Sequence, residues 1–336
     1  MAEFSGLVMT NYPAWKKRQV QAKGRSLLAL FITLTLILAL FNGLIKSFSL
    51  GKYFGKSRWD SKSSFVTALS TTPISLVIVQ KDPKRIIFLT LDEETYLTTG
   101  DPNEPIVKVS SIVDKDKGAQ LSKILTFAFR ANIENFVTFN KEQKIDKEKA
   151  KKWFKDYASI TTPFSILTGN LNREVKNTNI TRIDLLKLWW QVKGFSINNL
   201  DLVDLRQFRE EMLSWNNQKV LGVDDVVLKQ LIAKYLENLK VREENFKIKI
   251  SNSSEIAGAG RLAADFVSSV GGNVVEINTS PGTLDKTFLE TKDKSSYTAR
   301  YLANIFNCGI NGAPGKGEGA DITLVIGQDF ILKYFE

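Results

Sequence analysis

The residues that most suggest chemistry are Gly258 and Gly260, which open a predicted helix in the pattern G-x-G-x-x-A, with Glu276 18 residues after the first glycine. In a dinucleotide-binding domain such glycines let a pyrophosphate approach the helix N-terminus, and the acidic residue binds ribose hydroxyls. Here several residues separate the preceding strand, which ends near Ser251, from Gly258. The surrounding α/β unit is also too short for the full nucleotide-binding sheet. We therefore do not expect dinucleotide binding.

A second candidate site is the acidic run Asp92, Glu93 and Glu94, at the end of a predicted strand. Carboxylate oxygens are preferred ligands of Mg²⁺, so these three residues are candidates for holding a divalent cation. An acidic strand end is more often a solvated surface. The solvated surface is the favoured interpretation, and the metal site stays open as the weaker one.

Two absences exclude whole classes of chemistry. The chain has no His and a single cysteine, Cys308. A Ser-His-Asp triad, a Cys-His pair, a haem held by His and an ordinary zinc site are therefore not expected. An intramolecular disulfide cannot form, so folding depends on packing alone.

The elements that position these residues begin with a hydrophobic run from Leu27 to Ile45, which contains no charged residue. At a rise of about 1.5 Å per residue it nearly matches a bilayer core of about 30 Å. We expect it to span a membrane once, after a basic cytoplasmic head at 1–26. A cleaved signal peptide is the competing interpretation, but no A-x-A-like site follows. Residues 47–336 are then expected outside the cytoplasm, with a stalk at 47–72.

The net charge of +10 does not indicate nucleic-acid binding, because the excess flanks the hydrophobic run. Residues 1–60 carry nine basic and two acidic residues, whereas residues 246–336 carry nine and ten. Lys and Arg beside a membrane span are attracted to anionic lipids. Membrane lipid is therefore the expected partner of this region, and no nucleic acid is expected.

Two folded units are predicted after the stalk. At 73–243, a hairpin of SLVIVQ and RIIFLTL is followed by a helix from Gly118 to about Arg130, a strand at FVTFN, and a helix capped by Thr181. A further helix runs from about Asp224 to Leu239. At 244–336 the pattern predicts a small βαββαβ unit. The fold class is thus α/β (α+β), with a mixed sheet in the first unit.

The second unit resembles the LytR C-terminal domain of bacterial envelope proteins, in KISNSSEIAGAGRLAADFVSSVGGNVVEI and ADITLVIGQDF. Asn252 and Ser253 match its N-G-S loop, Gly258 or Gly260 its helix-opening glycine, and Gly327 and Asp329 its G-x-D ending. The resemblance implies an envelope location. It makes Asn252, Ser253, Gly258 and Gly260 candidates for binding a ligand.

The first unit resembles the LytR-CpsA-Psr catalytic domain in its hairpin, in ANIENFVTFN and in TRIDLLKLWWQV. Members of that family transfer lipid-pyrophosphate-linked polymers to the cell wall, binding pyrophosphate through arginines and a divalent cation through aspartate. Here Asp92, Glu93 and Glu94 occupy the family's P-R-D positions, Ile74 takes the place of the metal-binding aspartate, and of the paired arginines only Arg182 remains. A carboxylate in place of an arginine repels a phosphate.

These departures favour a non-catalytic protein that binds or scaffolds cell-wall glycopolymer or envelope proteins, with no cofactor and no metal. The alternative is a glycopolymer transferase with a rearranged site that uses Mg²⁺ and Arg182. Trp189 and Trp190 are expected in the core of their helix, and a carbohydrate-stacking platform is the less favoured interpretation.

Overall fold

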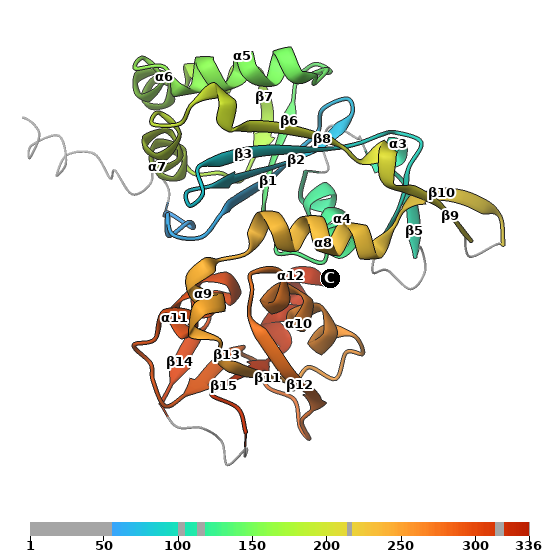
Figure 1. The fold of residues 1–336 in the computed structure, drawn as a ribbon, viewed down its shortest axis with the longest axis vertical. Helices are drawn as coiled ribbons and strands as arrows, with labels where there is room; N and C mark the ends of the chain where they lie inside the picture. Colours follow the sequence, from blue (N-terminus) through green and yellow to red (C-terminus); the bar gives the residue numbers. More distant parts are fainter. Residues whose placement is uncertain (1–55, 100–104, 113–117, 214–216, 313–318, 336) are drawn as a thin grey trace, which may run out of the picture. The chain divides into compact units, whose positions relative to one another are not determined.

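We describe the protein from a computed structural model, which covers residues 56–99, 105–112, 118–213, 217–312 and 319–335 (Figure 1). Residues Ser57–Glu336 cluster as one compact unit. The predicted basic head and the predicted span Leu27–Ile45 lie outside the described residues. No helix in the described ranges is both long and apolar enough to cross a bilayer.

A six-stranded mixed sheet organises the first half of this unit, in the order β7-β6-β1-β2-β3-β8. The predicted hairpin is confirmed as an antiparallel pair, whereas β1 pairs in parallel with β6 and β3 with β8. The strands are β1 (Phe65–Leu69), β2 (Ile74–Gln80), β3 (Arg85–Leu91), β6 (Asn135–Phe139), β7 (Val175–Thr178) and β8 (Leu200–Asp204).

Both faces of this sheet are covered, which explains the unbroken apolar runs of β2 and β3. Alternate residues such as Leu76 and Ile78 form one core with the helices α4 (Gly118–Phe129) and α8 (Asp225–Leu236). Val77 and Val79 face the other way, toward α5 (Lys147–Ala158) and α7 (Arg182–Val192), and α6 (Thr162–Thr168) packs beside α7 (Figure 1).

Two predicted helices begin where the sequence indicates, whereas the helix predicted from about Asp224 to Leu239 ends at Leu236. α4 begins at Gly118, where a Cβ would lie 2.2 Å from the Phe136 ring, so only glycine allows this approach to β6. α7 is capped by the Thr181 side chain, which accepts a hydrogen bond from Asp184 N at 3.1 Å. α5 has the same kind of cap, from Asp146.

Smaller elements complete the first half. Two antiparallel hairpins lie outside the main sheet, namely β4 (Tyr96–Thr98) with β5 (Ile106–Lys108) and β9 (Arg209–Leu213) with β10 (Lys219–Val223). The remaining helices are short: α3 (Val109–Ile112), α9 (Leu239–Glu244) and the 3₁₀ turns η1 (Asn170–Asn172), η2 (Ile197–Asn199) and η3 (Leu205–Phe208).

The C-terminal sheet has the order β12-β11-β15-β13-β14. Its elements are β11 (Lys247–Asn252), α10 (Ala259–Ser269), β12 (Asn273–Thr279), β13 (Phe288–Thr291), α11 (Tyr297–Phe306), β14 (Gly309–Asn311), β15 (Ile322–Ile326) and α12 (Gln328–Tyr334). The predicted βαββαβ order was therefore incomplete. It missed the three-residue edge strand β14, and it missed α12, which buries Phe330, Ile331 and Tyr334.

The two halves share a packed boundary inside the compact unit. Phe127 of α4 belongs to the C-terminal core, and its ring lies 5.3 Å from that of Phe335. Tyr334 donates a 2.5 Å hydrogen bond to Asn132 Oδ1, while Asn132 Nδ2 donates to Ile305 O at 3.2 Å. The C-terminal domain is thus bonded to the loop after α4.

The predicted stalk at 47–72 needs a correction. Its residues 65–69 form β1, an interior strand of the main sheet, because Phe65 and Leu69 bury their side chains on one face and Ala68 on the other. Trp59 is also buried, with its ring 5.1 Å from that of Phe65. The Ser- and Lys-rich residues around β1 are typical of a stalk, so the composition did not predict this five-residue strand.

Candidate functional site

A cavity in the described part of the chain lies between the sheet and the helices α5, α6 and α7. Its volume is about 620 Å³, within the range of about 300–1,000 Å³ that is typical of small-molecule sites. The sheet contributes one floor of apolar side chains, and the helices contribute the wall opposite. The floor residues are Phe65, Leu69, Val77, Val79, Ile86, Phe88, Val137 and Phe139.

The helix wall is also apolar over most of its surface. Trp153, Phe154 and Tyr157 come from α5, and Leu185, Leu188 and Val192 come from α7. The Tyr157 hydroxyl donates to Leu185 O at 2.6 Å, and burial raises its pKa, so it remains neutral. A mostly apolar lining of this kind favours hydrocarbon over ions.

One polar group of the floor has no internal partner. Thr67 lines the cavity, and its Oγ1 is buried without a hydrogen bond to any other described residue. A buried hydroxyl without a partner costs free energy.

The charged residues of the lining are Asp156, Arg173 and Glu174. Arg182 lies close by: its Nη2 is 3.7 Å from the position that a Cβ at Gly169 would take. The structure thus places the predicted candidate Arg182 beside the α6–η1 turn that borders the cavity, half-buried and outside the lining itself.

The acidic candidates Asp92, Glu93 and Glu94 follow β3, away from any cluster of metal-ligating side chains. Asp92 is paired with Arg209, and Glu94 Oε2 lies 2.7 Å from Lys108 Nζ. Within the ranges that the structure describes, no three His, Cys, Asp or Glu side chains come together as a metal site. Two of the three carboxylates therefore already have cationic partners from the β5 and β9 hairpin strands.

The loop candidates Asn252 and Ser253 are buried in the C-terminal domain. Asn252 Nδ2 donates to Ile256 O at 3.0 Å, and its Oδ1 accepts from Ser254 N at 3.1 Å. Ser253 N donates to Ile326 O at 2.9 Å, while its hydroxyl is buried without a partner among the described residues. These bonds shape the loop between β11 and α10. Ligand binding by either residue stays a prediction.

Gly258 and Gly260 are explained by local geometry. Gly258 caps α10 with φ of 87°, a conformation that favours glycine. A Cβ on Gly260 would lie 3.3 Å from Asn252 Cβ and 3.3 Å from Ile277 Cγ2, so its small size lets α10 pack on the sheet. Both glycines have a structural reason that requires no ligand.

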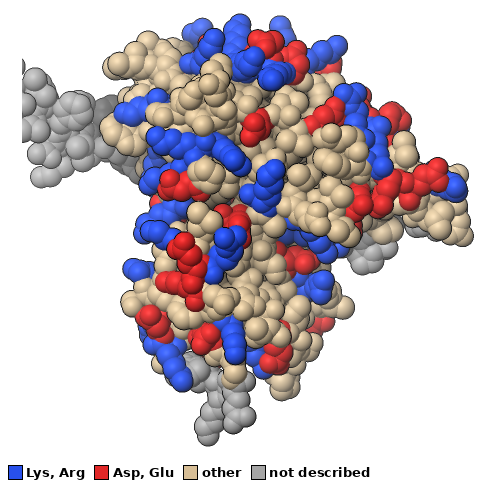
Figure 2. Space-filling model, in the orientation of Figure 1, with Lys and Arg blue, Asp and Glu red and all other residues tan. Residues whose placement is uncertain are grey.

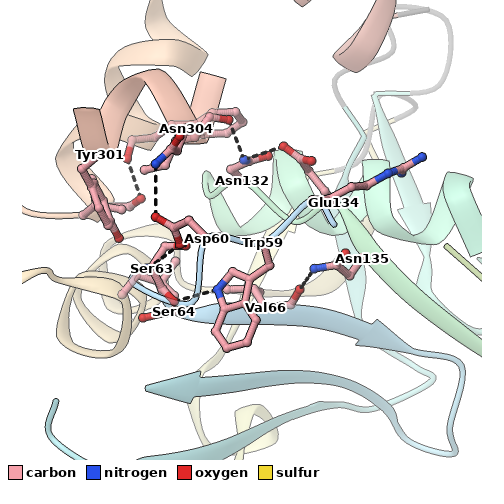
Figure 3. A pocket seen from close by; sticks show the side chains of 16 residues that line it. Trp59, Asp60, Ser63, Ser64, Val66, Asn132, Glu134, Asn135, Tyr301 and Asn304 are labelled. Carbon is pink, nitrogen blue, oxygen red and sulfur yellow. Dashed lines mark hydrogen bonds between the residues drawn. The ribbon is translucent and has the colours of Figure 1, made fainter. Parts of the chain in front are cut away.

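A second, smaller pocket of about 110 Å³ lies where the two halves meet (Figure 3). Asp60 and Asn304 face one another across it and are joined by a 3.2 Å hydrogen bond. Asn132 Nδ2 contacts Glu134 Oε1 at 2.8 Å, and Asn135 Nδ2 donates to Val66 O at 2.9 Å. These side chains form hydrogen bonds with other residues of the chain, so the pocket is lined by polar contacts at the boundary between the two halves.

Trp189 and Trp190 are not core residues. Trp189 donates from Nε1 to Ser159 O at 2.8 Å but is only partly buried, and Trp190 is 67% exposed. The expectation that both rings lie in the core was therefore wrong. Lys193 Nζ lies 3.2 Å from the centre of the Trp190 ring.

The apolar cavity was missed by sequence reasoning. Its lining comes from five strands and three helices, and each residue alone resembles an ordinary core residue. The sequence feature that could have indicated the cavity is the uncharged stretch of residues 157–172. It contains α6 and contributes several residues to the helix wall of the cavity.

Comparison with protein families gives one match. The model described as LytR cell envelope-related transcriptional attenuator matches residues 245–330. The predicted LytR C-terminal domain is confirmed over this range. A comparison with curated proteins finds no match.

Solved structures similar to this chain include proteins of the LytR-CPS2A-psr family. TagV of Bacillus subtilis is 14% identical, covering 51% of this chain and 94% of its own, with a TM-score of 0.38. A transcriptional regulator from Enterococcus faecalis is 10% identical, covering 52% and 87%, with a TM-score of 0.40. TagT, solved with bound octaprenyl pyrophosphate lipid, is 10% identical, covering 52% and 89%, with a TM-score of 0.34. Neither activity nor ligand follows from likenesses at this level.

Proposed function

We propose that this chain, which carries a LytR C-terminal domain at residues 245–330, is a membrane-anchored protein of the bacterial cell envelope. It binds the hydrocarbon chain of a lipid-linked glycopolymer and does not transfer the polymer. The observation that carries the proposal is the apolar cavity of about 620 Å³ beneath α5, α6 and α7. A long hydrocarbon chain gains from leaving water for such a lining.

The anchoring is supported by the sequence. The uncharged run Leu27–Ile45 has the length of a membrane span, and Lys and Arg lie on both sides of it. Residues 47–336 would then lie outside the cytoplasm, where a LytR C-terminal domain is expected. A lipid ligand would be available in the same membrane.

The lack of transfer is supported by the charges of the site. Pyrophosphate recognition needs forked cationic donors, and the charged lining here comprises one arginine, Arg173, with Asp156 and Glu174. Asp92 is neutralised by Arg209, so its carboxylate would have to exchange that partner before it could hold a cation. Both features weaken binding of a doubly charged headgroup.

The test uses the full chain in lipid nanodiscs with octaprenyl pyrophosphate as the probe. Binding should raise the unfolding temperature in proportion to the logarithm of the lipid concentration. Val137→Phe fills the cavity from the sheet side and should reduce the affinity at least tenfold. Val226→Phe is the matched control, because Val226 is exposed on α8. Equal affinities of wild type and Val137→Phe would refute the cavity as the lipid site.

A second candidate function is polymer transfer with a rearranged site, favoured by the position of Arg182 next to the cavity wall. Full chain, a lipid-pyrophosphate-linked glycan, a wall acceptor and Mg²⁺ would be incubated together. We expect no glycan on the acceptor. Polymer transfer by the wild type would contradict the proposed function. If Arg182→Ala abolished that transfer and the exposed control Arg261→Ala did not, the chain would be a transferase that uses Arg182.

A further inference from the structure

A stripe of exposed apolar side chains runs along α6 and the turn before it. Phe164 and Leu167 are three residues apart in α6, so they lie on one side of this helix, and Ile160 lies in the turn before it. Ile160 is 82% exposed and Phe164 is 70% exposed. Large apolar side chains in such a row, open to solvent, commonly mark a contact surface.

Trp190 of α7 extends this stripe. α6 packs against α7, and the bond from Trp189 Nε1 to Ser159 O brings the tryptophan pair next to Ile160. We call Ile160, Phe164, Leu167 and Trp190 the α6–α7 surface.

The charge pattern around this surface is that of a membrane interface. Residues 157–172 contain no charged side chain. The neighbouring helices carry lysines, including Lys151, Lys152 and Lys155 on α5, which also has the acidic Glu148 and Asp156, and Lys193 at the end of α7. Figure 2 shows uncharged residues over α6 with Lys and Arg nearby. Aromatic rings with lysines beside them favour the headgroup region of a bilayer, where the rings are partly buried and the ammonium groups reach water and phosphate.

The chain enters the folded unit beside this surface. Lys187 Nζ donates to Ser57 Oγ and to Trp59 O, each at 2.7 Å. Lys187 is three residues before Trp190, which is about 4.5 Å along a helix axis. Residues 46–56 alone separate Ser57 from the end of the predicted span, and an extended chain of that length reaches at most about 40 Å.

We propose that the α6–α7 surface docks onto the lipid bilayer, with its aromatic and aliphatic side chains in the headgroup region and the surrounding lysines on anionic phospholipid. The inference rests on the proposed membrane anchoring. The short tether keeps the surface at a high effective concentration near the bilayer, so even a weak contact is occupied.

Docking gives α6 two roles. Its outer side carries Phe164 and Leu167, while Thr162 and Ser165 line the cavity from its inner side. With the outer side in the headgroup region, a single helix of seven residues separates the bilayer from the cavity. A hydrocarbon chain then passes from membrane to cavity with little exposure to water.

The test is the depth of a spin label in vesicles of phosphatidylcholine and phosphatidylglycerol that contain the full chain. Cys308→Ala removes the native thiol, and a label is attached at Phe164→Cys or, as control, at Val226→Cys on α8, where Val226 is 64% exposed. We expect the label at 164 to be accessible to oxygen and to have lost accessibility to a water-soluble nickel complex. The label at 226 should remain accessible to nickel.

Adding Trp190→Glu and Ile160→Glu should return the label at 164 to water. A label at 164 as accessible to nickel as the one at 226 would overturn docking while leaving the anchoring intact. A label shielded from both oxygen and nickel would overturn it too, because that pattern indicates a protein contact. Full chain that washes off the vesicles in carbonate would overturn the anchoring itself, and docking with it.

Discussion

Ser57 Oγ donates a 2.7 Å hydrogen bond to Asp184 Oδ1, across 127 positions of the sequence. The same carboxylate accepts from the backbone N–H groups of Arg58 and Trp59, at 3.1 and 3.3 Å, and from the Thr181 hydroxyl at 2.7 Å. Asp184 is 3% exposed, so one buried acid joins the beginning of the folded chain to the first turn of α7.

Asp184→Ala should destabilise the protein by about 3 kcal/mol, because hydrogen bonds to a buried charge are each worth about 1.5–3 kcal/mol and their loss leaves backbone donors unpaired. Urea unfolding of the full chain in detergent measures the change. Asp201→Ala is the control, since Asp201 is exposed on β8 and its removal should change the free energy of unfolding by no more than about 0.5 kcal/mol. Equal effects of both substitutions would contradict the structural role of Asp184.

Thr67→Val should stabilise the lipid-free protein by about 1 kcal/mol, since it removes a buried hydroxyl that has no internal partner. The matched control is Thr126→Val. Thr126 Oγ1 is equally buried but donates to Ser122 O at 2.9 Å, so its replacement should destabilise. Thermal unfolding distinguishes the two signs.

Phe127→Ala should separate the unfolding of the two halves. Phe127 extends from α4 into the C-terminal core, and truncating a buried Phe costs about 3–5 kcal/mol. We expect one cooperative thermal transition in the wild type and two in the variant, measured by calorimetry. Phe129→Ala removes a ring from the first core instead and should lower the unfolding temperature with a single transition. Two transitions in the wild type would show that the halves are not coupled.

Glu244 should make stability depend on pH in the acid range. Partial burial raises the pKa of this carboxyl, but hydrogen bonds from Thr298 and from Tyr297 N outweigh it and hold the pKa below its ordinary value of 4.5. A lowered pKa means that the contribution is present above about pH 4.5 and is lost as the pH falls through the folded-state value. Glu244→Gln should therefore destabilise at pH 7 and approach the wild type at pH 3, measured by urea unfolding. The exposed Glu243→Gln should change little at either pH.

The elements predicted correctly carry strong local signals. The cap Thr181 with its apolar helix, the turn between SLVIVQ and RIIFLTL, and the glycine at the start of α4 each fix a local conformation from nearby residues. β1 and α12 were missed because they are short, although β1 pairs with the nearby β2 as well as with the distant β6. The burial of α12 depends on partners far away in the chain, since its Phe330 packs against Phe266, about 60 positions earlier.

The candidate site could not be predicted for a different reason. Val77 and Val79 are as apolar as Leu76 and Ile78 on the opposite face of β2, so the sequence indicates burial on both faces. It does not indicate that one face meets helices closely and the other leaves space. The space depends on how far α5 and α7 stand from the sheet, which no single residue encodes.

That space also has a calorimetric consequence. The cavity of about 620 Å³ is open to water, and its lining is mostly apolar. A hydrocarbon chain that enters it buries apolar surface, so its binding should lower the heat capacity. The heat-capacity change of binding is thus a direct readout of whether hydrocarbon occupies the cavity beneath α5, α6 and α7.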